Sequence, residues 1–206
     1  MDTAFLITGF VTLFVIIDPI GLTPLFVALT QGMTQKQRQT IALRAILTAI
    51  FVLSLFTLFG EAVLGFVGIS MPAFRIAGGL LLFLTALDML FQRRTKRRED
   101  QAEEEDHHDD PSVFPLGIPL IAGPGAIATM ILLSGQQPGM AGLAMVMGIM
   151  LAVLVIVFLL FLTATWLERA LGKTGINVVT RLLGMLLSAL AVQFVLDGLR
   201  AFGIAS

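Results

Sequence analysis

The sequence predicts an all-α integral membrane protein whose six transmembrane helices form two inverted three-helix repeats, with spans one and four broken at mid-membrane. Three observations lead to this prediction. Hydrophobic residues make up 57% of the chain and charged residues 13%, and the mean hydropathy of +0.95 lies far above that of soluble domains. Several segments are long and apolar enough to cross a hydrocarbon core. The second half of the chain also repeats landmarks of the first.

The predicted spans follow one another along the chain. They cover residues 4–29, 41–59, 72–91, 114–133, 141–166 and 176–199, each close to or above the roughly 20 residues that a helix needs to cross a bilayer. A charged linker, 92–112, separates a first repeat, 1–91, from a second, 113–206. Trp166, the single tryptophan, falls at a span end, where an amphipathic ring suits the membrane interface.

Landmark residues recur in the two halves at an offset of about 106 positions. The segment 17–21 matches 123–125, Glu61 matches Glu168, 68–70 matches 175–177, and Arg75 matches Arg181. If each half crosses the membrane three times, the second half must enter it from the opposite side. Inverted repeats of this kind build the alternately open gates of many secondary transporters around a site at the bilayer midplane.

Lysine and arginine are concentrated in alternate loops. They are Lys36, Arg38 and Arg44 after the first span, Arg93, Arg94, Lys96, Arg97 and Arg98 after the third, and Arg169, Lys173 and Arg181 between the fifth and sixth. The other two loops have none. Because basic loops are retained in the cytoplasm, we expect both termini to lie outside it.

Prolines and glycines interrupt the first and fourth spans at matching places. The segment 18–24 holds an aspartate, two prolines and a glycine, and 119–126 holds two prolines and two glycines. Proline removes a backbone donor and clashes with the preceding turn, so each span should consist of two half-helices around an unwound centre. In span one, Thr23 and Pro24 are expected to be the N-cap and first residue of the second half-helix. Such breaks persist in a membrane only where they are buried in protein or line a watery cavity.

We expect the two breaks to form one binding site. Free N–H groups at the start of each second half-helix favour an anion, and free carbonyls at the end of each first half-helix favour a cation or ammonium. The candidate substrate-binding residues are Asp18, Gly21, Thr23, Gly123, Gly125, Ala126 and Thr129. Asp18 is the strongest candidate, because an ionisable group deep in a span is costly and marks a functional site. Its carboxylate suits a substrate ammonium, a sodium ion or a coupled proton; alternatively, it caps the second half-helix.

Two glutamate–arginine pairs sit at matching span ends of the repeats. Glu61 with Arg75, and Glu168 with Arg181, are expected to form salt bridges near opposite membrane faces. They would act as gates that open in turn, or as static clips between adjacent spans. The alternative is that all four are simply solvated span ends.

Other polar and small residues in the spans fit structural roles. Asp88 and Asp197 lie near span ends and are interpreted as solvated, whereas the deeper Gln193 is expected to hydrogen-bond between helices. Glycines 78–79 and Gly184 occupy matching places, and small residues favour close helix packing in lipid.

The linker changes from basic to acidic along its length. Its basic cluster, 93–98, either binds anionic lipid head groups or only fixes the topology. The acidic tract with His107 and His108 is typical of a solvated tether rather than a metal site. The chain has no cysteine and no nucleotide-binding, hydrolase or zinc-protease motif. We therefore expect no enzyme, cofactor, metal site or nucleic-acid partner.

Three ordered segments resemble the MarC family of bacterial inner-membrane proteins. They are DPIGLTPLF (18–26), FRIAGG (74–79) and PLIAGPGAIAT (119–129), and the resemblance covers nearly the whole chain. Leu22 departs from the family, which often has asparagine there, so the first break has one polar group fewer. The resemblance implies a multi-pass protein of the bacterial inner (plasma) membrane, similar in outline to the LysE-type exporters. In that membrane, the charge bias of the loops places both termini in the periplasm. Some members of the family are described as transporters of small neutral amino acids.

The broken helices and this resemblance together predict a secondary transporter or exporter of small neutral amino acids that works by alternating access. The carboxylate of a zwitterionic substrate would lie at the half-helix N-termini near Thr23 and 125–127, and its ammonium on Asp18. A coupling proton or sodium ion, the surrounding lipid bilayer and a homo-oligomer are compatible with this prediction. The alternatives are an exporter of drugs or metal ions, for which the spans offer mainly Asp18 as a ligand, and a non-transporting scaffold, which gains nothing from unwound backbone.

Overall fold

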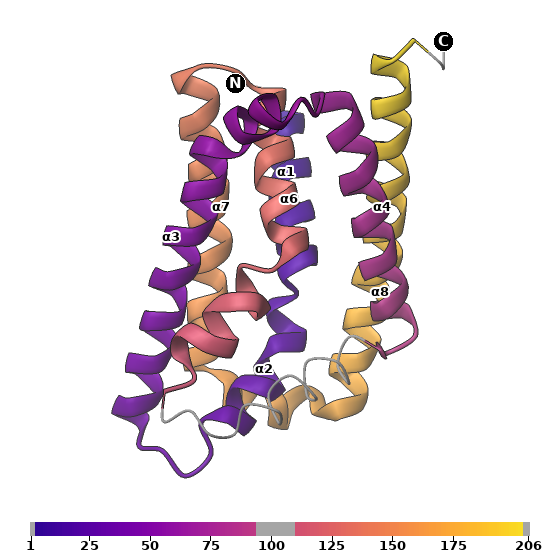
Figure 1. The fold of residues 1–206 in the computed structure, drawn as a ribbon. Helices are drawn as coiled ribbons and strands as arrows, with labels where there is room; N and C mark the ends of the chain where they lie inside the picture. Colours follow the sequence, from indigo (N-terminus) through magenta and orange to yellow (C-terminus); the bar gives the residue numbers. More distant parts are fainter. Residues whose placement is uncertain (1–2, 94–109, 204–206) are drawn as a thin grey trace.

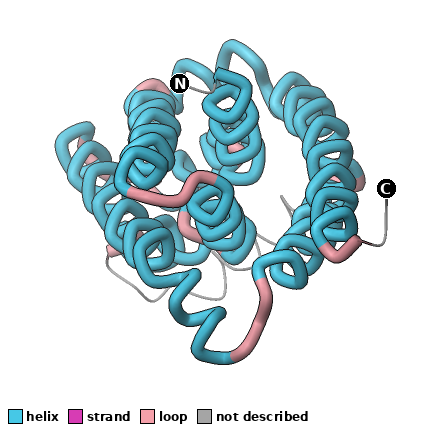
Figure 2. Tube along the Cα trace, turned by 90° about the horizontal axis from the view of Figure 1, so that it is seen from above, coloured by secondary structure: helices cyan, strands magenta, loops and turns pink. Residues whose placement is uncertain are grey.

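Helices account for nearly all of the residues that the computed structural model describes, 3–93 and 110–203 (Figure 1). They are α1 (Thr3–Ile17), α2 (Pro19–Leu29), α3 (Gln35–Val67), α4 (Met71–Leu90), an irregular helical segment η1 (Ser112–Ile121), α6 (Pro124–Gln136), α7 (Met140–Leu162) and α8 (Ala164–Ala201). Seen end-on in Figure 2, they stand side by side as a bundle, and these ranges contain no strand. The predicted all-α fold is confirmed.

The helices are long and apolar enough to cross a membrane. Five candidate spans qualify among the described residues: Thr3–Leu29, Gln35–Val67, Met71–Leu90, Met140–Leu162 and Ala164–Ala201. The helical segments η1 and α6 are bent by 56° at the break between them. If this bent pair is counted as one span, the number of candidate spans rises to six. The prediction of an integral membrane protein is thus confirmed, and the bent pair coincides with the predicted break in span four.

The start of α1 and the end of α8 lie at one end of the bundle, together with the α3–α4 and α6–α7 turns (Figure 1). We call this the terminal end. The α2–α3 turn and the α7–α8 junction lie at the opposite end, which we call the basic end because lysines and arginines follow both connections in the sequence. This arrangement is the one expected when a chain crosses a membrane an even number of times. The side of the membrane that the terminal end faces stays a prediction.

Helix α3 begins before the predicted span, and a capping box explains why. Gln37 N donates to Thr34 Oγ1 at 3.4 Å, and Thr34 N donates to Gln37 Oε1 at 2.8 Å. This reciprocal pair satisfies two of the backbone donors that a helix start leaves free. The polar first turns of α3 are therefore helical although they are not apolar enough to lie in lipid.

The fifth predicted span ends too late. Helix α7 ends at Leu162, where Thr163 Oγ1 donates to Leu159 O at 2.9 Å, so Trp166 belongs to α8. Gly172 adopts a φ of 60°, which divides α8 into a short segment, 164–171, and a long span, 173–201. A glycine reaches this left-handed region without the clash that a Cβ would cause.

Helix α4 packs more extensively against α8 than any other pair of described elements packs together. Glycines bring the two backbones close at two places. A Cβ on Gly79 would lie 2.8 Å from Ala191 O, and a Cβ on Gly184 would lie 3.2 Å from Ala86 O. The packing role predicted for these glycines is confirmed, as small residues let helices approach in lipid.

The two glycine contacts of the α4–α8 pair are equivalent under one sequence offset. Gly79 also faces Val195 N, at 3.1 Å from an added Cβ, and Gly184 faces Leu90 N, at 3.4 Å. The pairs Gly79 and Gly184, Ala86 and Ala191, and Leu90 and Val195 are each 105 positions apart. Each helix thus presents the same contact to the other, which supports the predicted repeat.

Asp110 lies in the segment before η1 and links that segment to α3. Arg44 Nη1 donates to Asp110 Oδ2 at 2.6 Å, and Ser112 N donates to Asp110 Oδ1 at 3.0 Å. Hydrogen bonding from Ser112, with a smaller contribution from Arg44, holds the pKa of the Asp110 carboxyl below its usual value. Because the pair is exposed, it stabilises the fold by no more than about 1 kcal/mol, and this contribution is lost as the pH falls through the lowered pKa. The proposed lipid-binding and histidine-containing stretches of the linker lie outside the described residues, apart from Arg93.

Candidate functional site

The first break lies at Asp18, between α1 and α2. Asp18 has a left-handed backbone (φ 57°, ψ 64°), and its Oδ1 accepts a hydrogen bond from Gly21 N at 3.1 Å. Pro19 follows as the first residue of α2, a position where the missing N–H has no helical partner to lose. The alternative in which Asp18 caps the second half-helix is therefore confirmed.

Thr23 and Pro24 do not begin the second half-helix, so that prediction is wrong. Both lie inside α2, and Thr23 Oγ1 donates to Pro19 O at 3.0 Å. Asp18 has already capped the helix at an earlier position, which leaves no role for a second cap. Leu22, which lies between Asp18 and Thr23 in the sequence, is fully buried.

The carboxylate of Asp18 is buried between two helices. The residue is 1% exposed, and Thr180 Oγ1 of α8 donates to its Oδ1 at 3.5 Å. A buried carboxylate inside a span is costly, which is why such groups are candidates for function. Thr180 is not among the predicted site residues, because one threonine in an apolar span does not reveal which neighbour it faces.

Gly21 has no room for a side chain beside Asp18. A Cβ on Gly21 would overlap Asp18 Oδ2 and lie 2.7 Å from Cγ. We expect Gly21→Ala to displace the carboxylate and weaken its cap, with a loss of about 1–2 kcal/mol in stability and a fall in any activity that depends on Asp18. Thermal unfolding of the purified variant measures the first effect.

The matched control for this substitution is Gly65→Ala in α3, where an added Cβ meets nothing within 4 Å. It should unfold at or slightly above the wild-type temperature, because alanine favours a helix over glycine. Equal behaviour of the Gly21→Ala and Gly65→Ala variants would contradict the expected clash.

The second break, between η1 and α6, differs from the first. Helix α6 begins at Pro124 after Gly123, which offers no side chain to cap it, so no carboxylate stands where Asp18 stands in the first break. Within η1, Phe114 and Ile118 have extended backbones (φ −129° and −133°). Each precedes a proline, and residues before proline avoid the helical region. The first half of span four is therefore less regular than the predicted half-helix.

The two breaks contact each other inside the bundle. A Cβ on Gly125 would lie 2.8 Å from Ile16 Cδ1, so the start of α6 packs on the end of α1. Ala126 and Thr129 are buried, and Thr129 Oγ1 donates to Gly125 O at 2.8 Å. The hydroxyl of Thr23 is occupied in the same way, by the carbonyl one turn back. Candidates from both breaks are thus neighbours, but both threonine hydroxyls already have backbone acceptors.

Neither predicted glutamate–arginine pair forms a salt bridge in the part of the chain that the structure describes. Glu61 and Arg181 are exposed, and Glu168 lies in the short segment 164–171. Arg75 instead lines a cavity together with residues of other helices. Matching positions in two repeats place residues at similar depths, but they do not fix the face of the helix on which each residue lies.

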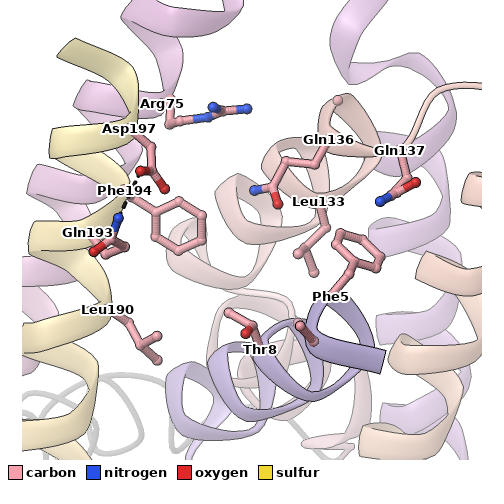
Figure 3. Close-up of a pocket in the computed structure, with 13 residues that line it drawn as sticks. Phe5, Thr8, Arg75, Leu133, Gln136, Gln137, Leu190, Gln193, Phe194 and Asp197 are labelled. Carbon is pink, nitrogen blue, oxygen red and sulfur yellow. Dashed lines mark hydrogen bonds between the residues drawn. The ribbon is translucent and has the colours of Figure 1, made fainter. Parts of the chain in front are cut away.

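A cavity of about 490 Å³ lies near the terminal end, between the α4–α8 pair on one side and α1 with α6 on the other (Figure 3). Its polar lining consists of Thr8, Arg75, Gln136, Gln137, Gln193 and Asp197, and its larger apolar residues are Phe5, Leu133, Leu190 and Phe194. Figure 3 shows Arg75 and Asp197 on the same side, with Gln136 across from them. The cavity therefore offers one cation and one anion in mainly apolar surroundings.

Sequence reasoning missed this cavity although it considered three of its residues, Arg75, Gln193 and Asp197. Asp197 is a lining residue and not only a solvated span end. Gln193 Nε2 donates to Asp197 Oδ1 at 2.8 Å within α8, so the predicted bond between helices is wrong. The available signal was that Arg75, Gln136 and Asp197 are polar residues near the ends of three different apolar spans. Only the fold shows that they line one cavity.

Apolar spans, two helix breaks in contact and a cavity at one end define the class as a polytopic, all-helical integral membrane protein. Within this class the chain belongs to the MarC family of integral membrane proteins, whose family model matches residues 3–202.

Relatives over nearly the full length come from archaea and bacteria. The UPF0056 membrane protein MJ0972 of Methanocaldococcus jannaschii is 43% identical over 95% of this chain and 86% of its own length. YvbG of Bacillus subtilis is 37% identical over 97% and 96%, and the inner membrane protein YhgN of Escherichia coli is 35% identical over 95% and 96%. No solved structure matches the chain.

Proposed function

We propose that this protein is a secondary transporter or exporter of small neutral amino acids that works by alternating access. The observation that carries the proposal is the contact between two helix breaks, one of which holds the buried carboxylate of Asp18. Irregular backbone at membrane depth is a feature of transporter binding sites, where helix ends face the substrate and its coupling ion. Neither catalysis nor scaffolding requires this arrangement.

The α4–α8 crossing supports the part of the proposal that concerns inverted repeats, 1–91 and 113–206. Its two glycine contacts are related by one offset, as two copies of a unit would be. In this proposal the terminal end faces the periplasm, and the protein lies in the plasma membrane, like the relative YhgN, which is named an inner membrane protein. A proton or a sodium ion supplies the coupling, and a homo-oligomer is compatible with the bundle.

The proposal is tested by flux through purified protein in liposomes. Uptake of glycine and alanine is measured with a proton gradient, with a sodium gradient and with neither. We expect saturable flux that at least one of the two gradients increases. Drugs and divalent metal ions are tested in parallel by thermal stabilisation of the solubilised protein, because a ligand that binds only the folded state raises its unfolding temperature. Stabilisation by these compounds without amino-acid flux would contradict the proposal.

A further inference from the structure

The geometry points to Arg75 and Asp197 as the residues that recognise a zwitterionic amino acid in the cavity at the terminal end. The substrate carboxylate binds the guanidinium of Arg75, and its ammonium binds the carboxylate of Asp197. This inference rests on the proposed function, because it names how the same substrate is held before it reaches the helix breaks. It assigns the substrate to a place distinct from Asp18 and the half-helix N-termini.

Arg75 is a cation in need of an anion. Its Nε is buried and has no hydrogen-bond partner, and Arg75 forms no salt bridge with any described residue. Figure 3 shows its guanidinium reaching from α4 across the cavity toward Gln136. A half-buried cation without a protein partner favours a bound anion. The planar fork of a guanidinium matches the two oxygens of a carboxylate, so a substrate carboxylate would supply the missing acceptors.

Asp197 is held in place on α8 and is available for an ammonium. Gln193 Nε2 donates to its Oδ1 at 2.8 Å, and the exposed Arg200 forms a salt bridge with the same atom, with its Nη1 at 3.8 Å. Neither contact uses Oδ2. Figure 3 shows that Asp197 and Arg75 lie on the same side of the cavity. The ammonium and carboxylate of an α-amino acid sit on one carbon atom, so a site that binds both needs opposite charges on neighbouring walls.

The remaining walls, which also include Thr8, Gln136 and Gln137, favour a neutral substrate side chain. Phe5, Leu133 and Phe194 contribute apolar surface to the cavity. The lining, all of it within the described residues, has no further charged group to pair with an acidic or basic substrate side chain. Such a side chain would therefore be left unpaired, which disfavours its binding. The volume of about 490 Å³ lies within the usual range for ligand pockets, so the site also admits neutral amino acids larger than alanine.

The test is calorimetric titration of the solubilised wild-type protein with three ligands of similar size. Alanine carries both charges, alaninamide lacks the carboxylate, and propionate lacks the ammonium. We expect each analogue to bind at least about 10-fold more weakly than alanine, since the loss of a hydrogen bond between charged groups typically costs this much. Equal binding of alanine and alaninamide by the wild-type protein would overturn the inference without any mutation.

Variants locate the effect. Arg75→Gln should lower the affinity for alanine at least about 10-fold, to that of alaninamide, and should leave alaninamide binding unchanged. Asp197→Asn should lower it to that of propionate. The matched control is Arg169→Gln, which removes an exposed arginine from the short segment 164–171 and should bind alanine like the wild type.

The inference and the proposed function fail in different ways. If wild-type protein carries alanine across liposomes and the folded Arg75→Gln variant binds alanine normally, the recognition site is wrong while transport stands. If the wild-type protein shows no flux but binding depends on Arg75 and Asp197 as described, the recognition site stands and transport is wrong. Thermal unfolding of each variant confirms that loss of binding is not loss of fold.

Discussion

Asp18→Asn should reduce amino-acid flux in liposomes to the background of protein-free vesicles while leaving the fold intact. Asparagine caps helices about as well as aspartate, so the hydrogen bond from Gly21 N to the side chain can be kept. The substitution removes only the charge, which a substrate ammonium, a sodium ion or a coupled proton requires. The residue is 1% exposed, so water cannot replace the lost carboxylate.

The measurement compares initial uptake rates of alanine by wild-type and Asp18→Asn protein at equal reconstitution. Asp110→Asn is the matched control, because it removes a carboxylate that is exposed and lies before η1. The control should retain flux. Flux of the Asp18→Asn variant equal to the wild type would remove Asp18 from the transport mechanism and leave it as a helix cap alone.

Gly79→Ala should destabilise the bundle by about 1–3 kcal/mol, which corresponds to a drop of several degrees in unfolding temperature for a chain of this size. The new methyl group would lie 2.8 Å from Ala191 O and 3.1 Å from Val195 N. Both are backbone atoms, so neither can move aside as a flexible side chain would. The cost therefore exceeds the small gain that alanine normally brings to a helix.

Gly148→Ala in α7 is the control for this prediction. An added Cβ there meets nothing within 4 Å, so the variant should be as stable as the wild type or slightly more stable. Thermal unfolding in one detergent compares the two variants directly. An unfolding temperature of Gly79→Ala at or above that of Gly148→Ala would show that α4 and α8 do not cross as closely as described.

The fold class was predictable because it depends on composition and on the lengths of apolar runs. The break at Asp18 was predictable for a local reason, since proline and glycine act on their own backbone. The first residue of α2 was misplaced at Pro24, because Thr23 and Asp18 are both good caps and the sequence does not show which one the helix uses.

The cavity at the terminal end could not be predicted, because it depends on how α1, α4, α6 and α8 are rotated. Arg75 was paired with Glu61 from their positions in the repeat, yet it lines a cavity with Asp197. Depth along a span follows from counting residues. The direction in which a side chain points depends on packing against helices that are distant in the sequence, such as α8 for a residue of α4.

The α4–α8 crossing has a mechanical consequence. Because Gly79 and Gly184 meet equivalent atoms of the opposite helix, tilting the pair in one sense strains the same kind of contact as tilting it in the other. Such a pivot has no built-in bias toward either membrane side. Any difference between the two directions must then come from the flanking residues, which differ at many matched positions. One example is Gln193 of α8, which corresponds to Asp88 of α4 at the same offset of 105.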